Sequence, residues 1–203
     1  LQQRIEEAEK RLAGESALAA KELKSRTITV EAAAKALPKN SALVEFVKIP
    51  DYDFAKGTFL PSHRYLAFVL TAAGDVTRVD LGEAGVLEAK ARQALEDIQV
   101  SQKRLDRLSL ARSRSSLESL SAVVWGPLEK PLGRADKVVV SPDGFLNLIP
   151  FMALIDGQGR PLVESHQLAY VASGRELVGA EGAAPKPASD LLLVANPAFD
   201  KKG

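Results

Sequence analysis

The sequence predicts an α/β fold, because short apolar runs typical of strands alternate with longer segments of helical periodicity. Three strand candidates come early, at 42–47, 64–70 and 76–81, and a buried-strand run follows at 137–141. The connections between the first three are too short for helical crossovers, so we expect an antiparallel meander.

The composition limits the class of protein. With 203 residues and 46% hydrophobic side chains, the chain can bury a core, which argues against global disorder. The 27 basic and 26 acidic residues nearly cancel to a net charge of +1, and aromatic residues make up 5%. A nucleic-acid module would need a concentrated basic surface or stacking aromatics. No apolar run reaches bilayer length. We therefore expect neither nucleic acid nor membrane as a partner.

The first part of the chain predicts two helices. Residues 1–26 carry an apolar stripe at Leu1, Ile5, Ala8 and Leu12, which needs a partner surface because a lone short helix is marginal in water. This segment is either the end of a repeat array or stalk, or a helix packed on its own domain. A second helix is predicted at 29–37. The chain begins without Met and stops just after a predicted strand, so we interpret it as a piece of a longer protein.

The middle of the chain predicts a helix over 84–112, with Leu87, Ala91, Leu95 and Ile98 near one face. The Ser/Arg-rich run at 112–116 is expected to interrupt it as a solvated loop, with a phosphate-binding or phosphorylation segment as the alternative. A second helix is expected to start at Leu117 and to end at 125–127.

The last third begins with the strand 137–141 and a Pro142-Asp143-Gly144 turn, in which proline presets φ and glycine tolerates a positive φ. The elements predicted after it are an extended segment at 145–149, a tight turn at 156–159, a strand at 167–172, a short helix opened by a capping box at Ser173–Glu176, a linker at 179–189 and a buried parallel strand at 190–195.

The residues themselves assemble no catalytic constellation. The chain has no cysteine, which excludes disulfides, thiolate metal sites and thiol catalysis within it. A serine-hydrolase elbow and a phosphate-binding loop are missing, and 157–159 reads as a turn rather than a dinucleotide site. His63 and His166 show no metal spacing and are interpreted as structural, and Asp51 and Asp53 lack the partners of a calcium site. No catalytic, cofactor-binding, metal-binding or substrate-binding residue is assigned.

The order of motifs nevertheless resembles a known family. An apolar strand, Pro-Asp-Gly, a second apolar stretch and Pro-Phe run from Val138 to Phe151, followed by Ala153-Leu154, Leu162-Val163-Glu164 and a strand through Tyr170. Further matches are Leu193–Pro197 and, upstream, Leu37-Pro38, Leu43–Phe46 and Tyr65–Val69. Over most of residues 27–200 this succession is similar to the N-terminal part of the CHAT family, bacterial relatives of caspases and separase.

The resemblance implies an incomplete caspase-like αβα sheet, preceded by an antiparallel β-meander and helices. It also implies a cysteine endopeptidase, often fused to tetratricopeptide repeats, whose base and nucleophile come from a His-Gly strand end and a Ser-Ala-Cys strand end. Both motifs fall downstream of 190–197, so no residue here receives a catalytic role, and no cofactor is implied. Asp143 and Glu164 remain candidates for lining a substrate groove.

We therefore expect a helical segment at 1–26, the N-terminal CHAT part at 27–178, a linker at 179–189, and the truncated first strand of the catalytic part at 190–203. The expected function is the non-catalytic portion of a cytoplasmic cysteine peptidase. The alternatives are a degenerate CHAT module that binds partners without cleaving them, and one chain of a processed pair. Expected partners are a protein or peptide substrate, the rest of the CHAT domain, tetratricopeptide repeats and, through an exposed sheet edge, a second copy.

Overall fold

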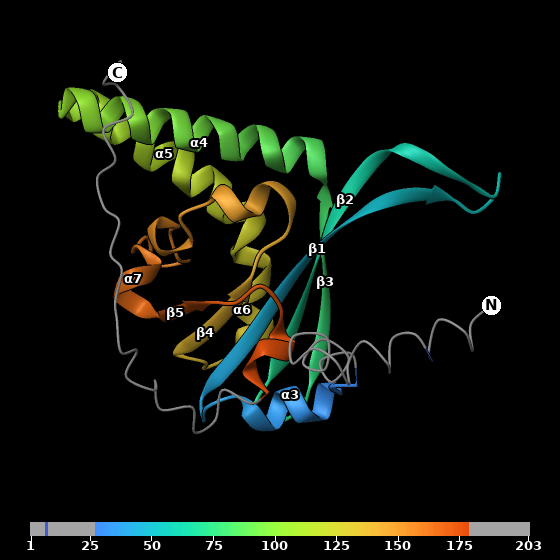
Figure 1. Ribbon diagram of the computed structural model, residues 1–203. Helices are drawn as coiled ribbons and strands as arrows, with labels where there is room; N and C mark the ends of the chain where they lie inside the picture. Colours follow the sequence, from blue (N-terminus) through green and yellow to red (C-terminus); the bar gives the residue numbers. More distant parts are fainter. Residues whose placement is uncertain (1–6, 8–26, 179–203) are drawn as a thin grey trace, which may run out of the picture.

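The computed structural model describes residue 7 and residues 27–178, which fold into one five-stranded sheet with helices on its two faces (Figure 1). The predicted helix at 1–26, the linker at 179–189 and the strand at 190–195 lie outside the described residues, apart from Glu7. The elements are α3 (Val30–Ala36), β1 (Ser41–Asp53), β2 (Thr58–Thr71), β3 (Val76–Glu83), α4 (Ala84–Arg104), α5 (Arg107–Val124), α6 (Gly126–Leu132), β4 (Lys137–Ser141), the 3₁₀ helices η1 (Gly144–Leu148) and η2 (Phe151–Ala153), α7 (Leu162–Ser165), β5 (Gln167–Tyr170) and the 3₁₀ helix η3 (Gly174–Leu177).

The sheet has the strand order β3-β2-β1-β4-β5. The first three strands pair antiparallel, which confirms the predicted meander. Strand β1 also pairs in parallel with β4, from Ser41 opposite Lys137 to Glu45 opposite Ser141, and β4 pairs in parallel with β5. The α/β fold class is therefore confirmed, with the meander and the parallel strands joined in one mixed sheet through β1.

The hairpin of β1 and β2 is longer than the sequence predicted. The polar sequence of 51–57 predicts a loop, but Tyr52 pairs with Phe59 and Asp53 with Thr58, and only 54–57 turn. Across this part of the ladder, the rings of Tyr52 and Phe59 lie 5.0 Å apart in an edge contact. Asp53 closes the turn by accepting hydrogen bonds from the amides of Ala55 and Lys56.

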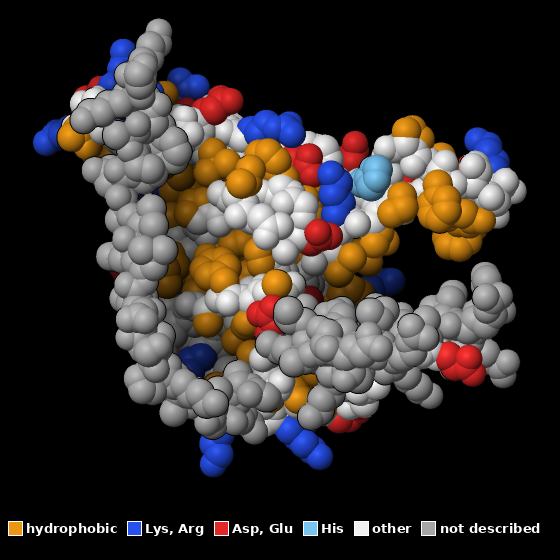
Figure 2. All heavy atoms as spheres, in the orientation of Figure 1, with side chains coloured by type: hydrophobic (Ala, Val, Ile, Leu, Met, Phe, Trp, Pro, Cys, Tyr) orange, Lys and Arg blue, Asp and Glu red, His pale blue; other side chains and the backbone are white. Residues whose placement is uncertain are grey.

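Residues 49–63 of this hairpin extend past the rest of the sheet, since β4 pairs only with 41–45 and β3 only with 64–70. We call this two-stranded projection the arm. It stands out from the sheet in Figure 1, and its tip is a cluster of hydrophobic side chains in Figure 2. Phe54 is 88% exposed and Phe59 is 68% exposed.

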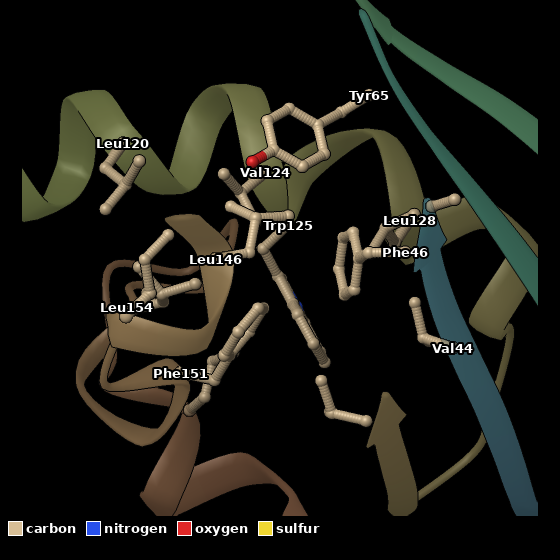
Figure 3. Close-up of a cluster of buried hydrophobic side chains, with 14 of the residues drawn as sticks. Val44, Phe46, Tyr65, Leu120, Val124, Trp125, Leu128, Leu146, Phe151 and Leu154 are labelled. Carbon is tan, nitrogen blue, oxygen red and sulfur yellow. The ribbon is translucent and has the colours of Figure 1, made fainter. Parts of the chain in front are cut away.

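One face of the sheet packs against α4, α5 and α6. Alternation along β1 sends Ala42, Val44 and Phe46 into this core, and Val69 and Ala67 of β2 lie opposite the last two. Trp125, between α5 and α6, is fully buried and lies within the same cluster as Phe46, Phe151 and Leu146 (Figure 3). The predicted helix end at 125–127 coincides with this residue.

The other face is covered at one end by α3 and η3. Leu43, Leu70 and Val139 point to this side and form a second, smaller cluster with the apolar residues of α3. Thr29 caps α3 by accepting a hydrogen bond from the amide of Ala32, although no capping box starts this helix. Ser173 likewise caps η3, as its spacing from Glu176 predicted.

The predicted break between the two long helices is wrong. The Ser/Arg-rich run at 112–116 lies inside α5, and the helices separate at Leu105 and Asp106 instead. Leu105 takes a left-handed φ of 53°, and Asp106 accepts a hydrogen bond from the amide of Ser109, an N-cap that starts α5. The serine hydroxyls stay compatible with a helix because they donate to carbonyls one turn earlier, as Ser113 does to Leu110.

The segment after β4 also differs from its prediction. Residues 144–148 form the 3₁₀ helix η1 rather than a strand or extended stretch, because Asp143 caps the segment and Gly144 turns it with a φ of 55°. Strand β5 ends at Tyr170, two residues earlier than expected. The tight turn at 156–159 is confirmed.

Candidate functional site

The Pro-Asp-Gly turn lies at the carboxyl end of β4, where parallel α/β sheets usually hold their sites. Asp143 uses both carboxylate oxygens there: Oδ1 accepts from the amide of Gly144 at 2.7 Å and Oδ2 from the amide of Lys48 at 2.8 Å. Lys48 belongs to β1, just beyond its pairing with β4. Asp143 therefore fastens the turn to the central strand, and each of its carboxylate oxygens already accepts a backbone hydrogen bond.

Gly144 is required at the next position. Its φ of 55° is left-handed, and a Cβ there would lie 2.6 Å from the hydroxyl oxygen of Tyr65. That hydroxyl accepts a hydrogen bond from the amide of Phe145 at 3.0 Å. The turn and the buried Tyr65 ring thus fit together only when residue 144 has no side chain.

Tyr65 and Glu88 complete a closed polar cluster around this turn. The Tyr65 hydroxyl donates to Glu88 Oε1 at 3.1 Å, and Lys48 Nζ lies 2.7 Å from the same oxygen. Burial raises the pKa of Tyr65 to about 12, and the hydrogen bond from Lys48 lowers the pKa of Glu88. At neutral pH the phenol is neutral and the carboxylate is ionised, and each is held by a neighbour, so the cluster fixes structure and offers no free base or nucleophile.

The two histidines are not brought together. His63 lies exposed on the arm, opposite Pro50. His166 precedes β5, half-buried, with its ring 5.3 Å from that of Trp125 and its Nδ1 2.9 Å from the Ser165 hydroxyl. Burial lowers the pKa of His166, which favours the neutral ring. Within residue 7 and residues 27–178, the His, Asp and Glu side chains form no group that could hold a metal ion.

The pocket beside His166, of about 370 Å³, is lined by charged residues that already have partners. Glu129 accepts from the amide of Gly157 at 2.6 Å, and Asp156 accepts from Arg160. The Gly157-x-Gly159 turn therefore lies against Glu129, and the carboxylates that line the pocket serve the loop rather than a ligand. The other acidic candidates are placed similarly: Asp51 pairs with Arg64 on the arm, and Glu164 lies exposed on the short helix α7.

A second hollow is apolar. Between α5 and the segment from η2 to α7 lies a groove of about 530 Å³, which we call the α5 groove. Leu117 and Ile155 form its buried floor, whereas Leu110, Met152 and Val163 at its rim are 50%, 41% and 57% exposed. Its other lining residues are Ser113, Arg114, Ala153 and Pro161. Hydrophobic side chains on this side of the molecule are visible below the α4–α5 pair in Figure 2. Such a surface suits packing against another apolar segment.

The strand order and the composition give the class of protein, which is an α/β protein with a mixed sheet and no cysteine. Residues 114–203 match the model of the CHAT domain, which confirms the family that the motifs predicted. Over these residues the chain is similar to the CHAT domain. No curated protein matches the chain. In the part of the chain that the structure describes, no helix has both the length and the apolar character needed to span a bilayer.

The sequence reasoning missed the α5 groove. Its lining comes from two segments that are far apart in the chain, and the rim side chains occupy ordinary helix and loop positions. The sequence signal was indirect: Leu110 in the long helix α5 and Val163 in the short helix α7 are apolar residues next to polar ones, and hydrophobic periodicity does not distinguish such residues from core residues.

Proposed function

We propose that this chain is the non-catalytic N-terminal portion of a CHAT-domain cysteine endopeptidase and serves as the scaffold for a His/Cys catalytic half. The observation that carries the proposal is the CHAT match over 114–203 in a chain that has no cysteine. A caspase-like mechanism needs a thiolate activated by an imidazole, and neither His63 nor His166 has a thiol to activate.

The structure of the Pro-Asp-Gly region supports a scaffold role. Asp143, Tyr65 and Glu88 are all engaged in internal hydrogen bonds, which tie the carboxyl end of β4 to β1, β2 and α4. The exposed apolar surfaces, by contrast, suit partners: the rest of the CHAT domain, tetratricopeptide repeats, a peptide substrate or a second copy along the edge strand β5. A bacterial cytoplasmic location fits a chain without disulfides.

Expression of the complete reading frame that encodes this chain tests the proposal. We expect the product to carry His-Gly and Ser-Ala-Cys strand ends after residue 203 and to cleave an unfolded protein such as casein. Replacement of that cysteine by alanine should abolish cleavage, and the 203-residue chain alone should cleave nothing. A full-length product that lacks both motifs, or cleavage by the chain alone, would contradict the proposal.

The alternative is a degenerate CHAT module that binds partners without cleaving them. The exposed aromatic side chains of the arm favour it, because a lone two-stranded hairpin with apolar side chains in water invites a partner. Mass measurement of a partner before and after incubation with the full-length protein separates the two functions: binding with an unchanged partner mass supports the module, and new fragments support the peptidase.

A further inference from the structure

We propose that the end of the helical hairpin formed by α4 and α5 binds the surface of an anionic lipid bilayer. We call residues 100–108, which connect the two helices, the hairpin tip. Its exposed leucine side chains enter the bilayer interface, and its lysine and arginine side chains contact lipid phosphate groups. The proposal goes beyond the proposed function and does not depend on it.

The hairpin tip extends past the hydrophobic core. On α4 the residues of the main core and those packed against it end at Ile98, and on α5 they begin at Leu117. Beyond these limits the buried side chains between the two helices are small and polar, namely Ser101, Ser109 and Ser113. Figure 1 shows the connection of α4 and α5 at the opposite end of the molecule from the arm. The tip is therefore a protruding end that a flat surface can reach.

Apolar side chains of the hairpin tip are turned to water. Leu105 is 75% exposed and Leu108 is 79% exposed, and Val100 beside them is 43% exposed. The two leucines line neither of the hollows described above. A leucine side chain that leaves water completely strengthens an association by about tenfold or more. These side chains are thus placed to enter an apolar medium rather than to form a cavity for a ligand.

The same segment carries a concentrated positive charge. Lys103, Arg104 and Arg107 face a single carboxylate in the segment, that of Asp106, which caps α5. Among the residues that the structure describes, no salt bridge joins these three cations to a carboxylate. Figure 2 shows basic and hydrophobic side chains together at this end of the molecule. The composition predicted no membrane partner because the charges of the whole chain nearly cancel, and that balance conceals this local cluster.

Two residues of the tip run against local structural preference. Leu105 takes the left-handed position after α4, where glycine is the usual residue because a side chain strains the backbone there. Arg107 is the first residue of α5, at the end of a helix where a cation is unfavourable. The stability of the fold explains neither residue. Departures of this kind are expected at functional positions.

An anionic bilayer is the partner that uses both features of the tip. Long lysine and arginine side chains reach headgroup phosphates while neighbouring leucines enter the acyl boundary. A nucleic acid would use the cations and leave Leu105 and Leu108 in water. A protein would need a cavity shaped for the protruding leucines, whereas a fluid bilayer interface needs none. The binding is peripheral, so it requires no helix that spans the bilayer.

Vesicle sedimentation tests the proposal with the purified 203-residue chain. The anionic vesicles contain phosphatidylcholine with about 30% phosphatidylserine, and vesicles of phosphatidylcholine alone are the neutral reference. One variant combines Leu105→Gly with Leu108→Ser, and a second replaces the three cations of the tip by glutamine. A matched control removes the same charge from three exposed positions outside the tip, by Lys130→Gln, Arg134→Gln and Lys137→Gln.

We expect the chain to bind the anionic vesicles at low salt and to leave the neutral vesicles largely unbound. Loss of the three cations should weaken binding by about a hundredfold, at roughly fivefold for each Lys or Arg near the surface. Loss of the two leucines should weaken it by about tenfold or more. The matched control should bind within about twofold of the parent chain, because charges far from the surface are screened.

Thermal melts separate binding from folding. The single change Leu105→Gly should leave the melting temperature unchanged or raise it, because glycine adopts the left-handed conformation without strain. A lower melting temperature would show that Leu105 serves the fold and would overturn the proposal.

The proposal is also overturned if the anionic vesicles bind no better than the neutral ones, or if the tip and control variants lose binding equally. Equally tight binding of duplex DNA or polyglutamate that ignores the leucine changes would assign the tip to a nucleic acid or an acidic protein instead. The assay needs no peptidase activity, so its result and that of the proposed function are independent.

Discussion

The contact between Gly144 and Tyr65 makes a quantitative prediction. Replacing Gly144 by alanine places a side chain on a left-handed residue, which costs about 1–2 kcal/mol. The new Cβ would also lie 2.6 Å from the Tyr65 hydroxyl oxygen and would displace it from the amide of Phe145 and from Glu88. Disturbing these hydrogen bonds costs about 1–3 kcal/mol more. We expect G144A to lower the free energy of unfolding by roughly 2–4 kcal/mol in total.

A double-mutant cycle isolates the steric part. In a Tyr65→Phe background the hydroxyl is gone, so Gly144→Ala should cost only the backbone part, about 1–2 kcal/mol. Gly82→Ala is the matched control, because Gly82 has a φ of 87° and a Cβ there would meet no atom within 4 Å. Urea unfolding followed by the fluorescence of Trp125 measures all four variants and the parent chain. Equal costs of Gly144→Ala with and without the Tyr65 hydroxyl would refute the reasoning.

Three further predictions concern other parts of the chain. Because burial lowers the pKa of His166 in the folded state, the unfolded chain binds the extra proton first; stability should fall as the pH drops below about 6.5, and a His166→Gln variant should show a smaller loss between pH 7 and pH 5.5 in thermal melts. Asp106→Ala should lower the unfolding free energy by about 1 kcal/mol through loss of the α5 cap, whereas the exposed Ser115→Ala should change it by less than about 0.5 kcal/mol; a larger effect at Ser115 would argue for the break that the sequence suggested. Replacing Phe54 and Phe59 by serine should leave the unfolding midpoint within a few degrees but reduce binding of a hydrophobic dye such as ANS; a large loss of stability would mean that these exposed rings hold the arm together.

The strands of this fold were predictable because their apolar side chains indicate burial on one or both faces of the sheet. The run Lys137–Ser141 and the β-branched centre of β1 are short and mostly apolar, which predicts a buried strand rather than a helix. The arm was not predictable, since its acidic and proline residues mark a loop in isolation, and pairing of Tyr52 with Phe59 is a contact across the ladder.

The helix break shows a different limit. The run of five serines and arginines at 112–116 suggests a break, yet a serine inside a helix can donate to the preceding turn and remain helical. The true boundary carries a single aspartate, Asp106, behind an ordinary leucine in a left-handed conformation. One N-cap residue without a capping box is a weak local signal in a sequence.

The candidate site, too, could be predicted only in part. The Pro-Asp-Gly turn could be predicted, because proline and glycine have direct backbone reasons to be there. That this turn is attached to β1 and β2 could not be predicted, because the hydrogen-bond partners of Asp143 and Phe145 lie far away in the sequence. The α5 groove is likewise a product of tertiary packing.

The double pairing of β1 has a consequence for how this protein must be handled and how it folds. Strand β4 takes its register from β1, and the hydrogen bond from Lys48 to Asp143 spans 95 residues of sequence. The CHAT match starts at residue 114, after β1, β2, β3 and α4 have passed. A clone cut at that boundary would present β4 without its template strand, and we expect it to aggregate through the open edge rather than fold. In the intact chain, we expect the pairing of β4 with β1 to form late and slowly, after the meander and its helices, because the paired residues are so far apart in sequence.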